Sequence, residues 1–150
     1  MKIRSSVPTD ADALVAIWRA AVLATHDFLS EDDFLQIEHQ VSHDYVPHAP
    51  FSVAVSGGDE TPMGFMGISG HHIDSLFVHP RFHGQGVGSA LLGNARMVAA
   101  GHALTVDVNE QNAQAVGFYL HQGFELIDRS PHDSDGRPYP ILSLAERAVS

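Results

Sequence analysis

Three alternating glycines, Gly84, Gly86 and Gly88, constrain this chain more than any other feature of its sequence. They follow an apolar, strand-like run from Ile73 to Val78 and precede a run with helical spacing. Glycine lacks a Cβ atom and tolerates positive φ, so a loop of this kind lets its backbone approach a ligand closely. The helix that follows would offer free N–H groups and the positive end of its dipole. The segment therefore predicts an anion site suited to a pyrophosphate.

Taken alone, the loop has a plainer explanation, because loop glycines often serve only as turns. Its spacing nevertheless excludes two nucleotide-binding motifs. No Lys followed by Ser or Thr comes after the last glycine, as a P-loop requires. The pattern Gly-x-Gly-x-Gly also differs from the Gly-x-Gly-x-x-Gly of dinucleotide-binding folds, and it lies in the middle of the chain.

A second motif follows, from Asn109 to Phe124. It predicts a strand end, a helix capped by Asn112, and a new strand after the helix-ending Gly123. Gly117 lies inside this helix, where glycine costs about 1 kcal/mol relative to alanine. We therefore expect either close packing or the approach of a cofactor at Gly117, although neutral drift would also explain it.

Together the two segments resemble the GNAT superfamily of N-acetyltransferases. The first is similar to the family's acetyl-CoA loop, Val-x-Pro-x-x-Arg/Gln-Gly-x-Gly-x-Gly/Ala, and the second to its Asn-x-x-Ala-x-x-Phe-Tyr-x-x-x-Gly-Phe segment. Every constrained position of the second segment is present, namely Asn112, Ala115, Phe118, Tyr119, Gly123 and Phe124. Shorter similarities at 24–30, 64–66, 76–78 and 138–140 extend the resemblance, over nearly the whole chain, to small bacterial acetyltransferases of the YjaB type.

Periodicity by itself predicts a mixed α/β (α+β) architecture. The resemblance implies the GNAT fold, a mixed and largely antiparallel sheet of about six to seven strands with about four flanking helices. Its central parallel pair is expected to splay apart and admit the cofactor. We expect strands at 2–6, 51–55, 63–69, 73–78, 102–108, 124–128 and 141–144. Helices are expected from a Thr9–Asp12 capping box to Thr25, from Ser30 to near Pro47, and over 86–100 and 112–122.

The resemblance implies acetyl-CoA as the cosubstrate. Backbone N–H groups of the loop would hold the pyrophosphate, and the fourth strand would hold the pantetheine arm and polarise the thioester carbonyl. The expected cofactor-binding residues are Leu76, Phe77, Val78, His83, Gly84, Gln85, Gly86, Val87, Gly88, Ser89, Asn109, Asn112 and Tyr119. One position departs from the family pattern, because His83 replaces the usual Arg or Gln before the first loop glycine, and Arg81 lies two residues earlier.

Tyr119 is the expected general acid. A phenol with a pKa of about 10 and a thiol with a pKa of about 8.5 are close enough for proton transfer to the departing sulfur. The acceptor amine must lose a proton, and the candidate bases are His72, Asp74 and His26. An acceptor pocket is expected at Trp18, His26, Phe28 and Tyr139, with core packing as the alternative for Trp18.

Composition restricts the partners. The 150 residues suit one domain over residues 1–150, and their formal charge of −10 disfavours nucleic-acid binding and favours cationic substrates such as amines. The chain has no cysteine, no apolar run long enough to span a membrane and no signal-like segment, so we expect a cytoplasmic protein. No metal is expected, because its 11 histidines lack the spacing and partners of a metal site.

We therefore predict an N-acetyltransferase that moves an acetyl group from acetyl-CoA to a primary amine by direct transfer in a ternary complex. The amine would belong to a protein lysine, a protein N-terminus or a small molecule, and the protein would be a monomer or a homodimer. The alternative is a catalytically weak sensor that binds acyl-CoA. A toxin that acetylates aminoacyl-tRNA is disfavoured by the negative charge.

Overall fold

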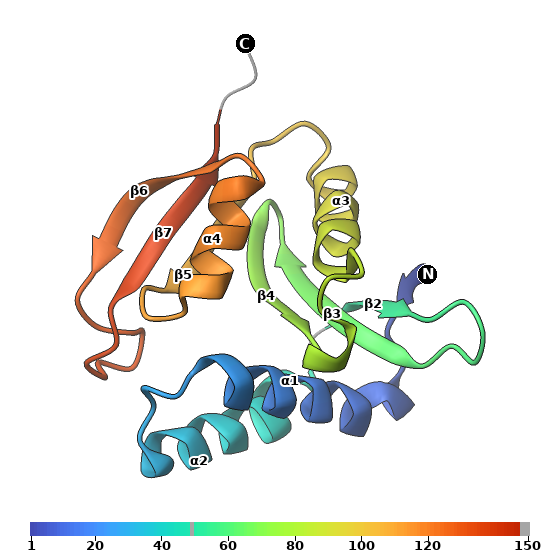
Figure 1. Cartoon of the computed structure of the whole chain (residues 1–150), viewed down its shortest axis with the longest axis horizontal. Coiled ribbons are helices and arrows are strands. Elements are labelled where there is room, and N and C mark those ends of the chain that lie inside the picture. Colours follow the sequence, from blue (N-terminus) through green and yellow to red (C-terminus); the bar gives the residue numbers. More distant parts are fainter. Residues whose placement is uncertain (49, 148–150) are drawn as a thin grey trace. The chain divides into compact units, whose positions relative to one another are not determined.

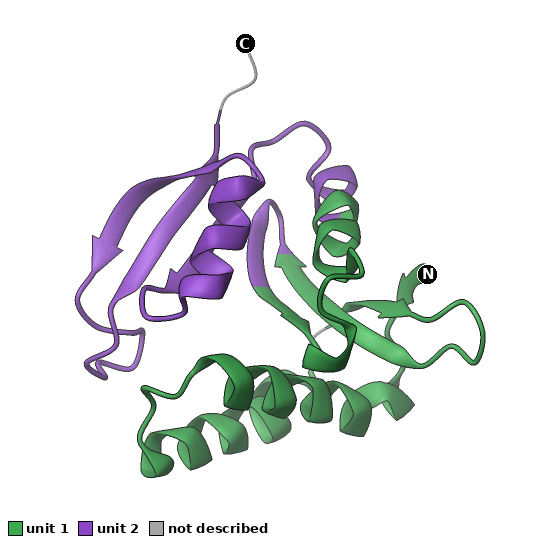
Figure 2. Cartoon of the chain, in the orientation of Figure 1, with its two compact units in different colours: residues 1–68, 75–94 green, residues 69–74, 95–150 purple. Residues whose placement is uncertain are grey.

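The computed structural model describes residues 1–48 and 50–147. The chain divides into two compact units, coloured green and purple in Figure 2. Unit 1 comprises Met1–Ile68 and Ser75–Asn94, and unit 2 comprises Ser69–Asp74 and Ala95–Ser150. The expectation of a single domain stays a prediction.

Within residues 1–48 and 50–147, seven strands form one sheet in the order β1-β2-β3-β4-β5-β7-β6. Strands β2 to β7 are labelled in Figure 1. The strands are β1 (Lys2–Ser5), β2 (Ser52–Val55), β3 (Pro62–Ser69), β4 (His72–Val78), β5 (Thr105–Asn109), β6 (Phe124–Ser130) and β7 (Ile141–Glu146). The sheet is mostly antiparallel, and its parallel pair is β4 and β5, with His72 beside Thr105 and Ile73 beside Val106. The splay of this pair stays a prediction.

In the described part of the chain, four α-helices complete the fold, which confirms the predicted class, a mixed and largely antiparallel sheet with helices. They are α1 (Ala11–Thr25), α2 (Glu31–Gln40), α3 (Val87–Ala99) and α4 (Ala113–His121). Among residues 1–48 and 50–147, no helix is long and apolar enough to cross a membrane.

The core of unit 1 lies where α1 meets the strands of its sheet. Helix α1 carries buried apolar residues at helical spacing, namely Leu14, Ile17, Trp18, Ala21 and Val22. All of them except Ala21 share a cluster with Val53 and Val55 of β2 and Phe65 of β3. Burying each large apolar side chain stabilises the fold by roughly 1.5–3 kcal/mol, so this cluster accounts for much of the packing that supports β3 and β4.

Strand β5 of unit 2 has one buried, apolar face and one polar face. Val106 and Val108 of β5 are buried, and α4 packs against β5 and β6. Side chains alternate along a strand, so Thr105, Asp107 and Asn109 share the opposite face, where Asp107 is exposed. The antiparallel register sets Asp107 beside Ser143 of β7. This face of the unit 2 sheet is therefore polar.

The structure corrects three local predictions. Helix α1 begins at Ala11, after a 3-10 turn over Pro8–Asp10, and its entry is organised by Asp10 instead of a Thr9–Asp12 capping box. The Asp10 carboxylate accepts two hydrogen bonds from Arg4, of 2.8 and 2.9 Å, and one from the Val7 N–H. This ion pair takes the place that the capping box was expected to have.

The other two corrections concern element boundaries. Helix α2 ends at Gln40, and a π-helical turn over Val41–Tyr45 continues toward Pro47. That turn allows the Tyr45 hydroxyl to meet Ser75 Oγ at 2.7 Å. Strand β5 begins at Thr105 and not at His102, because residues 100–102 form the turn that follows α3.

Candidate active site

In unit 1, the glycine loop has the backbone geometry that its sequence predicts. Gly84 and Gly86 have φ values of 78° and 79°, a region that residues with a Cβ atom rarely adopt. Both are exposed, and a Cβ atom built on either would meet no described atom within 4 Å. Helix α3 starts directly afterwards, and its first turn is closed by the bond from the Ala90 N–H to the Gly86 carbonyl. Open backbone at a helix N-terminus is suited to an anion.

The end of β4 is held close to this loop by another glycine. A Cβ atom on Gly64 of β3 would lie 2.8 Å from the Phe77 carbonyl oxygen and 3.1 Å from Val87 Cγ1. Only glycine allows β3 to approach the strand end and the first residue of α3 this closely. Leu76, Phe77 and Val78 are all half-buried, so part of each side chain remains accessible at the strand assigned to the pantetheine arm.

The unusual histidine of the loop is also accessible. His83 ends the 3-10 turn over Pro80–Phe82 and is exposed. The Arg81 guanidinium lies over the Phe82 ring, 5.3 Å from its centre. Gln85 and Ser89 are exposed as well. Arg81 and His83 are thus both exposed beside the loop.

In unit 2, the two asparagines hold the turn that starts α4. Asn112 caps the helix, because its Oδ1 accepts the Ala115 N–H at 3.2 Å, as the sequence predicts. Asn109 Oδ1 accepts the Gln111 N–H at 2.9 Å, and the Asn109 carbonyl accepts the Asn112 N–H. Among the described residues, neither asparagine donates a hydrogen bond through its amide NH₂ group, so the cap does not conflict with a contact to the cofactor.

Gly117 has no packing role within the described residues. It lies on the exposed side of α4, and a Cβ atom there would have no described neighbour within 4 Å. The expectation of close packing at Gly117 is therefore wrong, and cofactor approach and neutral drift remain as explanations.

The aromatic ring of Tyr119 is buried. It is 5% exposed, and it makes edge contacts with Phe118 and Phe124 at centroid distances of 5.1 and 5.2 Å. Among the described residues no group bonds its hydroxyl, and none of their fully buried side-chain N or O atoms lacks a partner. The Tyr119 oxygen is therefore not completely enclosed by the described residues. Burial raises the pKa of Tyr119, so the phenol stays protonated at neutral pH and acts as a hydrogen-bond donor.

His26, at the end of α1 in unit 1, is held in one tautomer. The Thr25 hydroxyl donates its proton to the Ala21 carbonyl at 2.8 Å, so it accepts from His26 Nδ1 at 2.7 Å. Burial lowers the pKa of His26, which favours neutral imidazole with a free lone pair on Nε2. Phe28 lies beside it at a ring-centroid distance of 5.1 Å. The structure thus brings together two of the residues assigned to the acceptor.

His72 of unit 2 has a different setting, with partners on β5. Its Nδ1 lies 2.7 Å from Thr105 Oγ1, and its Nε2 lies 3.8 Å from Asp107 Oδ2. Ser143 Oγ donates to Asp107 Oδ1 at 2.8 Å. Asp74 instead accepts a hydrogen bond from Ser69 in the hairpin that joins β3 and β4.

Thr105, Asp107 and Ser143 were missed by the sequence analysis. The alternation of polar and apolar residues in Thr105–Asn109 could have indicated a polar strand face. The pairing with Ser143 of β7 is long-range, however, and no local pattern predicts it.

Two residues assigned to the acceptor pocket are buried. Trp18 is 3% exposed and stacks on Phe34 at 5.5 Å, in the core of unit 1. Tyr139 of unit 2 is 8% exposed. Both side chains have packing roles. For Trp18, core packing was the alternative that the sequence left open.

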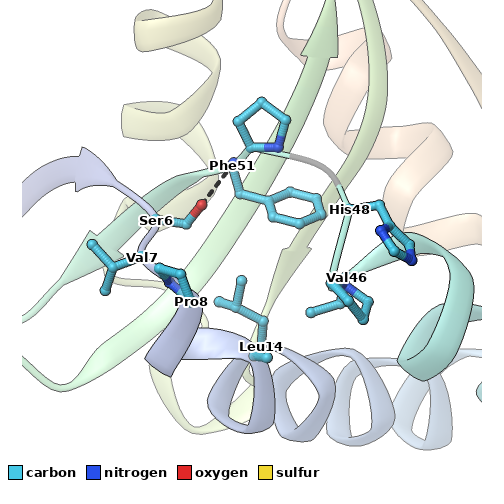
Figure 3. Close-up of a pocket in the computed structure, with 10 residues that line it drawn as sticks. Ser6, Val7, Pro8, Leu14, Val46, His48 and Phe51 are labelled. Atoms are coloured by element: carbon cyan, nitrogen blue, oxygen red, sulfur yellow. Dashed lines mark hydrogen bonds between the residues drawn. The ribbon is translucent and has the colours of Figure 1, made fainter.

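A cavity of about 370 Å³ lies in unit 1, beside the start of α1 (Figure 3). Its wall is largely apolar, and its Ser6 hydroxyl accepts the Phe51 N–H at 2.9 Å. None of the residues that the sequence assigns to the site lines it. Within the described ranges, no group of three His, Cys, Asp or Glu residues could hold a metal ion. The absence of a metal stays a prediction.

Comparison with known proteins identifies the family. The family model for the acetyltransferase (GNAT) domain matches residues 47–126. Peptidyl-lysine N-acetyltransferase YjaB of Salmonella typhimurium is 49% identical over 144 residues, covering 96% of this chain and 97% of that protein. The chain belongs to the GNAT acetyltransferase family.

Solved GNAT structures agree with the fold. The solution structure of apo-form YjaB from Escherichia coli matches with a TM-score of 0.91 and 45% identity, over 99% of this chain and 98% of that one. PaiA N-acetyltransferase from Thermoplasma acidophilum, in complex with coenzyme A, matches with a TM-score of 0.74 over 99% and 100% of the two chains. At 18% identity, that second likeness concerns the fold alone. As a GNAT member this protein is an N-acetyltransferase, and the alternative of a binding sensor has no such support.

Proposed function

We propose that the protein transfers the acetyl group of acetyl-CoA to the ε-amino group of a lysine in a peptide or protein. One observation carries the choice of acceptor. The Salmonella protein named peptidyl-lysine N-acetyltransferase is 49% identical and aligns over nearly the full length of both chains. The charge of −10 also favours a cationic acceptor. A protein N-terminus or a small amine would use the same chemistry.

Acetyl-CoA is the proposed cosubstrate, and backbone groups of unit 1 are its proposed binding groups. Gly84 and Gly86 leave open space where a Cβ atom would stand, and the loop leads into the N-terminus of α3. Both features suit a pyrophosphate. We assign the remaining loop residues and Leu76, Phe77 and Val78 of β4 to the cofactor, with Asn109 and Asn112 of unit 2 as further contacts.

Tyr119 is the proposed donor to the leaving sulfur. Its ring is held by aromatic contacts, and no described residue engages its hydroxyl, which supports this role. Since burial raises the pKa of Tyr119, complete proton transfer to a thiolate becomes less favourable than two free groups would allow. A strong hydrogen bond to the developing thiolate is the better description of its action.

The acceptor amine must lose a proton before it attacks the thioester, and His72, Asp74 and His26 are the candidate bases. His26 presents a free Nε2 lone pair, because Nδ1 donates to Thr25. Asp74 is engaged with Ser69. His72 combines an imidazole with a nearby carboxylate, that of Asp107.

We propose a cytoplasmic location for the reaction, whereas the choice between monomer and homodimer stays a prediction.

An acceptor panel tests the proposal. The protein is incubated with acetyl-CoA and a peptide that has a blocked N-terminus and one lysine, the same peptide with Lys→Arg, a lysine-free peptide with a free N-terminus, or spermidine. Thiol release gives the rate, and mass spectrometry locates the acetyl group. We expect acetylation of the lysine peptide at least tenfold faster than of the others. Equal or faster transfer to the free N-terminus or to spermidine would overturn the assignment to lysine.

A further inference from the structure

The polar network around His72 extends beyond the residues assigned to the reaction so far. It lies entirely within unit 2 and joins three strands of the sheet: β4 through His72, β5 through Thr105 and Asp107, and β7 through Ser143. The His72 and Asp107 side chains are 39% and 54% exposed. A solute can therefore reach both of them.

A hydroxyl group holds the imidazole of His72, and another holds the carboxylate of Asp107. Thr105 Oγ1 holds the Nδ1 side of the imidazole at 2.7 Å, and Ser143 Oγ holds Asp107 Oδ1 at 2.8 Å. Nε2 and Oδ2 then face one another across 3.8 Å, which is longer than the roughly 2.7–3.2 Å of an N–H···O hydrogen bond. Within residues 1–48 and 50–147, no group donates a hydrogen bond to Oδ2. The network therefore presents a carboxylate oxygen with capacity for another donor, directly beside an imidazole nitrogen.

A primary ammonium group complements this pair of atoms. It carries one positive charge and three N–H donors, so one donor can reach Oδ2 while a second reaches Nε2. We propose that Asp107 and His72 bind the ammonium group of the acceptor, and that His72 removes its proton. Thr105 and Ser143 act as positioning residues that orient the imidazole and the carboxylate. The inference rests on the proposed function, because it requires an amine acceptor.

The proton transfer is balanced within this network. One N–H bond of the ammonium breaks as an N–H bond forms at His72 Nε2, and the amine keeps the electron pair that attacks the thioester. The resulting imidazolium stands beside the Asp107 carboxylate, which stabilises its charge. Nε2 must begin without a proton, so His72 must be in the Nδ1–H tautomer, with Nδ1 donating to Thr105 Oγ1. The His26 ring, in contrast, contacts Thr25 and Phe28, and within the described residues no ion pair joins it to a carboxylate.

The first test uses the unmodified protein. The imidazole ¹⁵N signals of His72, assigned with a His72→Gln variant, report the tautomer directly. We expect the neutral ring to carry its proton on Nδ1 and not on Nε2, and the Nε2 signal to shift when n-butylamine, which mimics a lysine side chain, is added without acetyl-CoA. A neutral His72 with its proton on Nε2, or signals that butylamine leaves unchanged, would overturn the proposal.

The second test separates acceptor binding from the other steps. Asp107→Asn should raise KM for the lysine peptide about two- to fivefold, the range expected for a partly exposed ion pair, and leave acetyl-CoA affinity unchanged. Asp12→Asn in the first turn of α1 removes the same charge from an exposed position outside this network and should leave KM unchanged. Equal KM values for Asp107→Asn and the wild type would reject this inference while lysine acetylation stands. If lysine peptides are poor acceptors but butylamine still shifts His72, the assignment to peptidyl lysine fails and the amine site stands.

Discussion

The two compact units contribute different kinds of groups to the proposed reaction. Unit 1 offers backbone, in a loop where Gly84 and Gly86 have positive φ and open space on their Cβ side. Unit 2 offers side chains, namely the Tyr119 phenol and the His72–Asp107 pair. A backbone site depends on conformation and tolerates most changes of its neighbours, whereas a side-chain site depends on individual atoms. Substitutions in the two units should therefore affect different steps of the reaction.

The largest expected effect belongs to unit 2. Tyr119→Phe keeps the ring contacts with Phe118 and Phe124 and removes the hydroxyl alone. Losing this donor should lower kcat by roughly 10²–10⁴, while acetyl-CoA affinity and thermal stability should hold. Initial-rate assays measure kcat, and calorimetry on the same preparation measures the affinity for acetyl-CoA.

Tyr139→Phe is the matched control, because it removes a hydroxyl from another buried tyrosine of unit 2. We expect its kcat to change less than that of Tyr119→Phe by at least a factor of ten. Near wild-type kcat in Tyr119→Phe would show that water or another group protonates the sulfur. A joint loss of binding and stability would instead make Tyr119 a structural residue.

The next largest effect is expected in unit 1, where the Asp10 side chain contributes to the stability of the fold and not to binding. The hydrogen bonds from Arg4 lower the pKa of Asp10. Because the folded pKa lies below the unfolded value of about 3.9, the stabilisation is complete well above that pH and declines as the pH falls below it. Asp10→Asn should lower the free energy of unfolding by about 1.5–3 kcal/mol at pH 7, and by less in acid.

Urea unfolding at a series of pH values measures this difference. Asp12→Asn removes the same charge from the exposed first turn of α1 and should cost less than about 1 kcal/mol. If the two variants were equally stable, or if the loss in Asp10→Asn grew on acidification, the Arg4–Asp10 pair would not be what stabilises the start of α1.

Asp10 also illustrates which predictions the sequence supports. Local signals were read correctly at Asn112, which caps α4, and at Gly123, whose φ of 97° ends it. The Arg4–Asp10 bond was missed, and a capping box at Thr9–Asp12 was expected in its place. Capping patterns are common, and their strength depends on tertiary partners that a short window of sequence does not contain.

The same limit applies to the candidate site. Tyr119 and the loop glycines belong to contiguous motifs, so their positions could be predicted from the residues and the family resemblance. The contacts of His72 with Thr105 and Asp107 depend on how β4 pairs with β5 and β5 with β7. Strand register follows from long-range packing, and therefore the hydrogen-bond partners of the candidate base came from the structure.

In unit 1, Gly86→Val changes the loop backbone. Its φ of 79° is strained for a β-branched residue, and the added side chain would occupy the open space proposed for the pyrophosphate. Acetyl-CoA affinity should fall at least tenfold, which is about 1.4 kcal/mol. Calorimetry measures it, with Gly58→Val in an exposed turn as the control. Unchanged affinity in folded Gly86→Val would remove the loop from the cofactor site.

The smallest expected effect is that of Gly117→Ala, which tests whether the backbone of α4 in unit 2 also approaches the cofactor. Gly117→Ala places a methyl group where no described atom lies within 4 Å, so it should stabilise the helix by up to about 1 kcal/mol. Reduced acetyl-CoA affinity in this more stable variant would assign Gly117 to the cofactor. Unchanged affinity would leave neutral drift as its explanation, and reduced stability would contradict the open surroundings of this position.

The division between binding by unit 1 and chemistry by unit 2 is tested most directly by single-turnover acetyl transfer. The wild type, Gly86→Val and Tyr119→Phe are each mixed with saturating lysine peptide over a wide range of acetyl-CoA concentrations. We expect Gly86→Val to need more acetyl-CoA but to reach nearly the wild-type rate at saturation. Tyr119→Phe should saturate at the wild-type concentration with a rate lower by roughly 10²–10⁴. A Gly86→Val rate that stays low at saturation, or a Tyr119→Phe rate that recovers with more acetyl-CoA, would contradict the account.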